Sequence, residues 1–349
     1  MSKVYIIAEI GPNHNGDINI ALSMIDELSN SGVDAIKFQL SNPDELYSKD
    51  SFKANYQKLN DDSKSAKEMS RKNQLSFQEH KLLKQKCDNY NIDYLCTAFD
   101  LESLKFLNEK LDICYFKIPS GEIFSIDLLE YISNFKKPVI LSTGMSTYDE
   151  IKKSIELINS NFKKDITILH CISNYPAKIK NVNLKNLIKI KKLFGFPVGF
   201  SDHTIGNECA IASVALGSKI IEKHVTFDKN SKGPDHKASC DINEFKQLVS
   251  QIRIIEKAIG NEDRIISNEE KETLKVARKS IVSTRTLMVG DIIKRTDVCF
   301  KRPGTGFLPI DIDKVVGKKT IIEIPKDSVI KKEFLSWKKL SVFLQVLDP

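Results

Sequence analysis

Two lysines of this chain lie within short segments that are otherwise almost entirely apolar, Lys37 in one and Lys117 in the other. Such a segment is typical of a buried strand, and an unpaired buried charge is costly, so each ammonium group needs a partner. One interpretation is an ion pair with Glu9 or Glu122. The other, which we favour, is a pair of cations that hold an anionic ligand, because several such positions converge on one rim.

Hydroxyl groups and glycines lie at comparable positions of neighbouring segments. Thr97, Ser120 and Ser142 each stand near the end of an apolar segment, and Gly121 and Gly144 follow closely. Hydroxyls together with backbone N–H groups are the donors that commonly surround phosphate. With the two lysines, they predict a phosphate-binding site.

Five of the six histidines lie at or just after the ends of predicted strands. His203 and His224 belong to consecutive segments and are therefore expected to be neighbours. Two imidazoles with water and a substrate oxygen would suit a catalytic divalent ion with open positions. Two histidines are weak evidence for a metal, so a metal-free acid–base pair remains the alternative.

Composition limits the classes of function. The net charge of +7 comes from 53 basic and 46 acidic residues, and no basic patch alternates with aromatic residues, which argues against nucleic-acid binding. The seven cysteines form no C-x-x-C pair, as is typical of reduced thiols in a cytoplasmic protein. The N-terminal residues resemble neither a signal peptide nor a membrane span, so we expect no membrane partner.

The elements that must position these residues are strands that alternate with helices. Apolar residues three and four apart, as in Ile151, Ile155 and Ile158, indicate helices between the strands. Eight such units in about 250 residues predict an α/β fold, a (β/α)8 TIM barrel. An open doubly wound sheet is the alternative, weakened because no G-x-G-x-x-G follows the first strand. The candidate strands are Val4–Ile10, Ala35–Gln39, Asp93–Phe99, Cys114–Ser120, Pro138–Gly144, Ile166–Cys171, Pro197–His203 and Lys219–Val225.

The pattern of alternating strands and helices ends after the last barrel helix, which we expect at Gln251–Ile259. We expect a catalytic barrel over residues 1–260, a polar linker over 261–275, a small mostly-β domain over 276–337 and a tail, 338–349, without an assignment. Glycine and proline turns separate three short predicted strands in the small domain. Within the barrel, the loop over residues 41–75 is long, and long loops in compact domains are often functional. The strands of the small domain are predicted at Ser280–Ser283, Asp297–Lys301 and Thr320–Ile324.

Eight ordered motifs give the chain a family resemblance that covers almost its full length. The motifs are Ala8–Gly11 with Asn13–Gly16, Lys37–Gln39, Phe116–Glu122, Leu141–Met145, Gly199–His203, Glu222–His224, Gly233–His236 and Lys301–Gly304. In this order they resemble the sialic acid synthase family, which includes N-acetylneuraminate and N,N'-diacetyllegionaminate synthases. The resemblance implies a TIM barrel joined to an antifreeze-like (SAF) domain. It also implies a homodimer in which the SAF domain of one subunit covers the active site of the other.

The same resemblance assigns roles to individual residues. His203 and His224 look like ligands of a divalent ion, Mn²⁺ first, with Mg²⁺ or Co²⁺ as alternatives. Glu9, Glu122 and His224 are the expected catalytic groups, with Glu122 near the metal. Lys37, Thr97, Lys117, Ser120, Ser142 and Ser201 look like the phosphoenolpyruvate site, and Ser173 stands where some members carry a phosphate-binding Asn. Glu9, Gln39, Tyr175, Asp235 and, from the partner chain, Arg302 look like contacts to the sugar or the reacting centre.

The implied reaction joins phosphoenolpyruvate and water to an N-acetylated amino sugar, giving a nine-carbon sugar acid and phosphate. N-Acetylmannosamine and 2,4-diacetamido-2,4,6-trideoxymannose are both candidate acceptors. One alternative is a 3-deoxy-sugar-acid synthase that uses phosphoenolpyruvate and a sugar phosphate, against which the Lys301–Gly304 motif and the terminal β domain argue. The other is a barrel that binds sugar without catalysis, which the full set of lysines and histidines disfavours.

Overall fold

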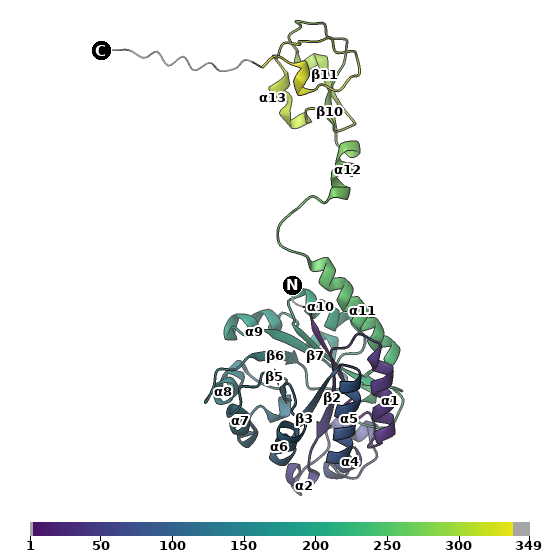
Figure 1. Ribbon diagram of the computed structural model, residues 1–349, viewed down its shortest axis with the longest axis vertical. Helices are drawn as coiled ribbons and strands as arrows, with labels where there is room; N and C mark the ends of the chain where they lie inside the picture. The colour runs from purple at the N-terminus through teal and green to yellow at the C-terminus, as the bar shows by residue number, and fades with distance from the viewer. Residues whose placement is uncertain (1–2, 338–349) are drawn as a thin grey trace, which may run out of the picture. The chain divides into compact units, whose positions relative to one another are not determined.

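The computed structural model describes residues 3–337, and within them eight parallel strands close into a barrel (Figure 1). The strands pair in sequence order and β1 also pairs with β8, with Tyr5 opposite Ile220 and Glu9 opposite His224. This closure confirms the predicted TIM barrel and excludes the open sheet. The strands are β1 Tyr5–Glu9, β2 Ala35–Leu40, β3 Asp93–Ala98, β4 Phe116–Ile118, β5 Val139–Ser142, β6 Ile166–Cys171, β7 Val198–Asp202 and β8 Ile220–Thr226.

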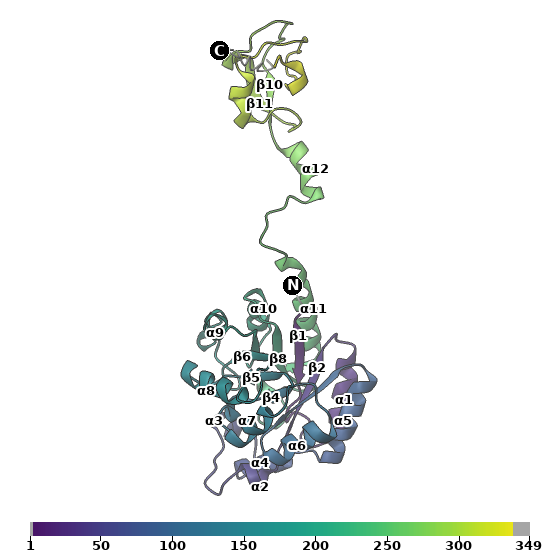
Figure 2. The same ribbon diagram turned by 60° about the vertical axis from the view of Figure 1, so that its left-hand side comes forward.

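One long helix follows each strand and packs on the outside of the barrel, as the two views show (Figures 1 and 2). Local sequence fixes where these helices begin: Thr147 caps the helix after β5 and exchanges hydrogen bonds with Glu150 in a capping box. The last helix begins at Ile242, not Gln251, because Asp241 and Glu244 form a capping box there. The helices are α1 Ile18–Ser29, α5 Phe77–Asn89, α6 Leu101–Lys110, α7 Ile126–Ser133, α8 Tyr148–Ile158, α9 Asn186–Phe194, α10 Glu208–Ala215 and α11 Ile242–Ile259.

The fourth strand is much shorter than the predicted range Cys114–Ser120. It ends at Ile118 because Pro119 has no N–H group for a strand ladder, and Ser120–Glu122 forms a 3-10 helix instead. The other predicted strands of the barrel differ from the observed ones by at most two residues at either end. A two-residue strand, β9 Cys240–Asp241, adds a short parallel pairing to the end of β8. Further 3-10 turns lie at Ile179–Asn181, His236–Ala238, Arg295–Asp297, Pro309–Asp311 and Lys332–Phe334.

The barrel interior changes from apolar to polar along its axis. Side chains of a strand alternate between the two faces, so every second residue points inward. One inward layer contains Ile7, Leu95 and Ile140, which are fully buried in an apolar cluster separate from the helix-facing core. Two residues further along β1 and β3 come Glu9 and Thr97. The apolar layer therefore closes the barrel interior below a polar layer, which lies at the C-terminal ends of the strands.

The long loop after β2 is folded over residues 41–75 and contains three short helices, α2 Pro43–Leu46, α3 Asn55–Asn60 and α4 Ala66–Lys72. A buried lysine holds this loop together: Lys53 Nζ donates to Asp61 Oδ1 at 3.0 Å and to the carbonyl oxygen of Ser63 at 2.9 Å. The backbone N–H of Gly233, after β8, donates to the carbonyl oxygen of Asn60 at 3.0 Å. The loop after β2 is thereby attached to the loop after β8.

The described residues from Asn261 to Trp337 form a second compact unit, distinct from the barrel unit that ends at Gly260. It begins with α12 Asn268–Ala277, which lies partly in the stretch predicted as a linker, 261–275. The antiparallel strands β10 Ser280–Ser283 and β11 Val298–Lys301 and the short helix α13 Ile312–Val315 follow. The predicted strand Thr320–Ile324 is wrong, because its two end residues make only isolated bridges. The tail at 338–349 lies outside the described residues.

The described residues contain no helix that is both long enough and apolar enough to cross a bilayer. All seven cysteines lie in this part of the chain, and none is paired in a disulfide.

Candidate active site

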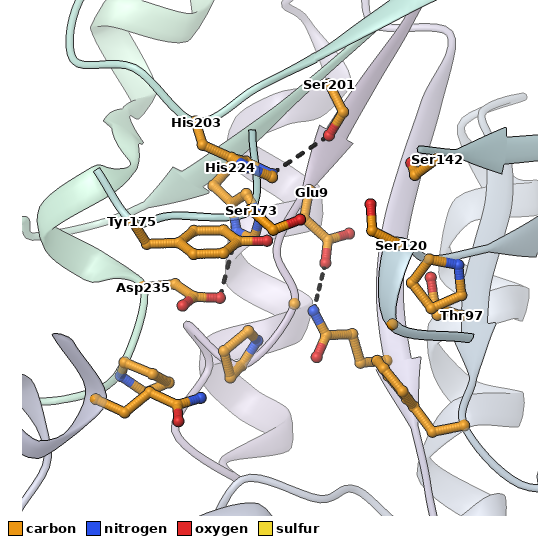
Figure 3. A pocket seen from close by; sticks show the side chains of 18 of the residues that line it. Glu9, Thr97, Ser120, Ser142, Ser173, Tyr175, Ser201, His203, His224 and Asp235 are labelled. Atoms are coloured by element: carbon orange, nitrogen blue, oxygen red, sulfur yellow. Dashed lines mark hydrogen bonds and ion pairs between the residues drawn. The ribbon is translucent and has the colours of Figure 1, made fainter. Parts of the chain in front are cut away.

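A cavity of about 380 Å³ opens at the C-terminal ends of the barrel strands. It brings together thirteen residues that the sequence singled out from eight different strands and their loops, ten of which are labelled in Figure 3. These residues are Glu9, Lys37, Gln39, Thr97, Lys117, Ser120, Ser142, Ser173, Tyr175, Ser201, His203, His224 and Asp235. In TIM-barrel enzymes this face carries the catalytic groups, so the cavity is the candidate active site.

Two lysines and two glutamates form a buried charge network at the bottom of the cavity. Lys37 Nζ lies 2.6 Å from Glu9 Oε2 and 3.7 Å from Glu222 Oε2. Lys117 Nζ lies 3.7 Å from Glu222 Oε1. All four side chains are at most 5% exposed. Without a ligand, therefore, both lysines have carboxylate partners, one of which is the predicted Glu9 and the other Glu222 instead of Glu122.

The network divides the acidic groups into one firmly ionised carboxylate and one that binds protons more readily. Burial opposes the ionisation of Glu222, but the ammonium groups of Lys117 and Lys37 outweigh it and lower the pKa of Glu222 to about 2. Burial raises the pKa of Glu9, and the charge of Glu222 raises it further, against the opposing effect of Lys37. Glu222 is thus the fixed counter-ion, whereas Glu9 is better suited to carry a proton.

Hydroxyl groups surround the two lysines. Lys117 Nζ donates to Ser142 Oγ at 2.8 Å, and Lys37 Nζ donates to Thr97 Oγ1 at 3.2 Å. On the same side, the backbone N–H of Gly144 donates to Ser120 Oγ at 2.9 Å. A Cβ atom at position 144 would lie 2.2 Å from Ser173 Oγ, so any other residue there would displace the side chain of Ser173. Two cations and four donors in one buried place are the chemistry of a phosphate or carboxylate site.

His203 and His224 lie beside the charge network, where Ser201 Oγ contacts both His203 Nε2 and Glu222, and their ring centroids are 5.4 Å apart. The Nδ1 of His203 donates to the carbonyl oxygen of Ile172 at 2.8 Å, so its Nε2 is unprotonated, and Ser201 Oγ lies 3.3 Å from this nitrogen (Figure 3). The buried Nδ1 of His224 has no hydrogen-bond partner. Burial lowers the pKa of both imidazoles, so both are neutral. Two neutral imidazoles with an unsatisfied buried nitrogen fit a divalent ion.

The described residues contain no group of three or more His, Cys, Asp or Glu side chains that could hold a metal. An ion at the histidine pair would therefore keep open positions for water and substrate, as catalytic sites do. Tyr175 packs against both rings (Figure 3). Its ring centroid lies 4.1 Å from that of His203 and 5.5 Å from that of His224. The tyrosine ring restricts how both imidazoles can turn.

A third group of side chains lies between the lysines and the histidines. Gln39 Nε2 donates to Glu9 Oε1 at 2.8 Å. Asp235 Oδ2 lies 3.6 Å from His224 Nδ1, and burial raises the pKa of Asp235 to about 7 (Figure 3). The outer wall comes from the loop at 41–75, including Tyr56, whose ring centroid lies 5.2 Å from that of Tyr175.

Sequence reasoning missed one central residue and several peripheral ones. Glu222 received no role in the sequence analysis. It stands two positions before His224 on the same strand, and because side chains of a strand alternate between its faces, this spacing indicates that both point inward. The lining residues of the loop at 41–75 follow no periodic pattern that could have identified them. They are Tyr47, Ala54, Tyr56, Gln57, Met69, Ser70, Asn73 and Gln74.

Two predicted residues do not line the cavity. Glu122 is half-buried in the 3-10 helix after β4, where its carboxylate accepts a hydrogen bond from Ser125 Oγ. The structure therefore does not support its predicted place near a metal. Arg302 belongs to the second unit, where its Nε donates to the carbonyl oxygen of Ala277 at 2.8 Å.

The chain is similar to known proteins over most of its length. N,N'-Diacetyllegionaminic acid synthase of Campylobacter jejuni is 40% identical over 335 residues, which cover 95% of this chain and the whole of the relative. The enzyme of the same name from Legionella pneumophila is 37% identical, over 95% of this chain and 94% of the relative. The crystal structure of N-acetylneuraminic acid synthetase from Leptospira borgpetersenii in complex with citrate matches with a TM-score of 0.70 and 33% identity, over 78% of this chain and 90% of that chain.

Family comparisons cover both units of the chain. Residues 24–264 match the NeuB family and residues 278–336 match the SAF domain. The resemblance to sialic acid synthases, noted from eight motifs, is thereby confirmed. The chain belongs to the NeuB family of sialic and legionaminic acid synthases and carries a SAF domain after its barrel.

Proposed function

We propose that this enzyme condenses phosphoenolpyruvate with an N-acetylated amino sugar and water, giving a nonulosonic acid and phosphate. The observation that carries the proposal is one cavity with two kinds of wall. Lys37 and Lys117 with their hydroxyl neighbours suit the anionic substrate, and His203 and His224 in the same lining suit the carbonyl substrate. A reaction between two substrates needs both held at once in attack geometry.

In the proposed reaction, C3 of phosphoenolpyruvate forms a bond to the C1 aldehyde carbon of the open-chain sugar. Water then adds to C2 of the former phosphoenolpyruvate, and the C2–O bond to phosphate breaks. Lys117 and Lys37 balance the charges of the carboxylate and phosphate through both steps. Glu222 stays ionised beneath them and keeps both lysines protonated and in place.

The proton movements fall to the groups between the two walls. The aldehyde oxygen gains a proton as it becomes a hydroxyl, and the attacking water loses one. Glu9 and Asp235 line the cavity and both have raised pKa values, so they suit these two transfers. A divalent ion held by His203 and His224, most simply Mn²⁺, would polarise the aldehyde as a Lewis acid.

The charges of the cavity support an acceptor without a phosphate group. Among the lining residues from the described part of the chain, the only lysines are Lys37 and Lys117, and there is no arginine. Both lysines lie at the bottom of the cavity and already face carboxylates. The outer wall offers amides and aromatic rings instead, including Gln57, Asn73 and Tyr56. These groups suit hydroxyl and acetamido substituents better than a second phosphate, which favours a nonulosonate synthase over a sugar-phosphate-dependent one.

Of the two acceptors, we propose 2,4-diacetamido-2,4,6-trideoxymannose. Two relatives at 40% and 37% identity are named N,N'-diacetyllegionaminic acid synthase. Phosphate release from phosphoenolpyruvate should be measured with this sugar, with N-acetylmannosamine and with arabinose 5-phosphate, each with added Mn²⁺. We expect the diacetamido sugar to give the highest kcat/KM. Release with arabinose 5-phosphate alone would contradict the proposal, and no release with any of the three would favour a barrel without catalysis.

We also propose that the enzyme works as a cytoplasmic homodimer in which the SAF domain of each chain completes the site of its partner. Arg302 is then the residue that reaches the sugar, since a guanidinium group can make paired hydrogen bonds to hydroxyls or a carbonyl. The support is the motif Lys301–Gly304 and its resemblance to the family pattern. The reduced thiols at all seven cysteines agree with a cytoplasmic enzyme.

A further inference from the structure

A second buried ion pair lies directly behind the histidine wall, outside the cavity. Lys223 Nζ lies 2.7 Å from Asp202 Oδ2, and the two side chains are 1% and 0% exposed. Asp202 on β7 and Lys223 on β8 are direct register partners. Neither residue lines the cavity. The proposed reaction therefore gives this pair no direct role.

The pair lies in a layer that is otherwise apolar. Along β7 and β8, alternate residues point inward, where Ser201 Oγ donates to Glu222 Oε1 at 2.9 Å. Asp202 and Lys223 are the intervening residues, so they point toward the helices. Their same-face neighbours Phe200, Ile221 and Val225 belong to the apolar core between barrel and helices.

Stability alone does not explain an ion pair in such a layer. Removing two charges from water costs about as much as their attraction returns, and apolar residues of similar size often serve equally well. The attested benefit of buried ionic groups is a defined register or geometry.

Asp202 and Lys223 both form hydrogen bonds to Thr204, the residue that follows His203. Asp202 Oδ1 accepts from the backbone N–H of Thr204 at 2.9 Å and from its hydroxyl at 2.7 Å. Lys223 Nζ donates to the carbonyl oxygen of Thr204 at 2.9 Å. The backbone N–H of Thr204 is therefore bound to Asp202, which precedes His203. Its carbonyl oxygen is bound to Lys223, which precedes His224.

We infer that Asp202 and Lys223 are positioning residues that fix the spacing and angle of the two imidazoles. The inference rests on the proposed role of His203 and His224 as ligands of a divalent ion. An ion with only two protein ligands depends strongly on the distance between them, and residues behind metal ligands typically affect affinity by 10- to 100-fold. The pair acts through the histidines and touches no substrate.

The test compares two double variants that each replace a partly or fully buried ion pair by apolar residues. The first is Asp202→Leu with Lys223→Met. The control is Asp34→Leu with Arg253→Met, which removes the pair at the N-terminal end of β2, where Arg253 Nη2 lies 2.7 Å from Asp34 Oδ2. Mn²⁺ binding is measured by electron paramagnetic resonance of the free ion, and kcat and the KM for phosphoenolpyruvate are measured separately.

We expect the first variant to bind Mn²⁺ roughly tenfold or more weakly, with a matching fall in kcat and an unchanged KM for phosphoenolpyruvate. The control should match the wild type in all three, whatever happens to its melting temperature. Wild-type Mn²⁺ affinity and kcat in the first variant would overturn the inference. If that variant does not fold, Thr204→Val, which removes only the hydroxyl bond to Asp202, should shift Mn²⁺ binding in the same direction, and unchanged binding would overturn the inference.

The wild-type measurements separate this inference from the proposed function. If the wild type releases no phosphate from phosphoenolpyruvate with any acceptor, the proposed reaction is wrong, and Mn²⁺ affinity alone decides the role of the pair. If the wild type binds no Mn²⁺ but is active, the histidines are a metal-free pair. A fall in kcat at constant KM then still supports positioning, and an unchanged kcat contradicts it.

Discussion

The carboxylate of Glu222 lies 3.7 Å from the ammonium group of Lys117 and the same distance from that of Lys37. It is therefore shared between the two cations that face the anionic substrate. All three groups are buried. The charges of the two lysines are balanced only when a second carboxylate, that of Glu9, is included. An incoming anion must share lysines that already have partners, and this arrangement has consequences that can be measured.

Replacing Glu222 by Gln should make the enzyme less stable and yet bind anions more tightly. The change leaves two buried ammonium groups with one carboxylate, and breaking a buried pair in this way typically costs about 3 kcal/mol or more. An anion then supplies the missing charge. We expect Glu222→Gln to melt at a lower temperature, to bind inorganic phosphate roughly tenfold more tightly by calorimetry, and to turn over more slowly.

Glu122→Gln is the matched control, because Glu122 lies outside the cavity lining. It should leave phosphate affinity unchanged. Equal phosphate affinity in the wild type and in Glu222→Gln would show that the lysines are not the anion site.

Removing one imidazole should abolish most turnover without unfolding the barrel. His224→Ala deletes one of two proposed ligands, and a bound ion contributes several kcal/mol to stabilising developing charge, so kcat should fall by about 100-fold or more. His170→Asn is the control, because His170 bonds to the carbonyl oxygen of Val182 and does not line the cavity. Whatever its melting temperature, the Mn²⁺ affinity of the control should equal that of the wild type. Full activity of His224→Ala in the presence of a chelator would refute the metal role.

Sequence reasoning reached the barrel and most of its site because both depend on local patterns. Apolar strands and capped helices define eight repeating units, and polar residues at strand ends must meet on one rim when the barrel closes. Glu122 shows where the pattern fails: Pro119 ends β4 early, and the 3-10 helix that follows points this residue elsewhere. The wall from the loop at 41–75 depends on tertiary contacts such as Tyr56 on Tyr175, which no periodicity encodes.

Mixed dimers can test whether Arg302 acts on the site of the partner chain. Arg302→Ala and His203→Ala should each be nearly inactive alone. If the SAF domain acts across the dimer, a heterodimer of the two has one complete site, made from the intact barrel of the first chain and the intact SAF domain of the second. Random mixing of equal amounts should then restore roughly a quarter of wild-type activity.

The control mixture combines Arg302→Ala with wild-type-length chains that carry both substitutions, which can form no complete site. It should remain inactive. Recovery in neither mixture would place Arg302 in the site of its own chain, and activity of Arg302→Ala alone at the wild-type level would exclude a sugar contact.

Two histidines outside the cavity should make the barrel sensitive to mild acid. Burial lowers the pKa of His14 to about 4 and that of His80 to about 3, from ordinary values near 6.5. The geometry agrees for His14, since its Nδ1 accepts from the backbone N–H of Gly16 at 3.0 Å and must be unprotonated to do so. His80 is fully buried and bonds through Nδ1 to the hydroxyl of Tyr94 at 2.6 Å.

Because both folded pKa values lie below the unfolded ones, the unfolded chain binds more protons between pH 6.5 and pH 4. Stability is therefore complete above pH 6.5 and decreases as the pH falls. Between pH 6.5 and 5 each histidine should cost about 1.6 kcal/mol. In His80→Gln, the melting temperature of the barrel should depend less steeply on pH in this window. Tyr94→Phe removes the hydrogen bond and keeps the imidazole, so its melting temperature should depend on pH as steeply as that of the wild type. An equally steep dependence in His80→Gln would assign the acid sensitivity to other groups.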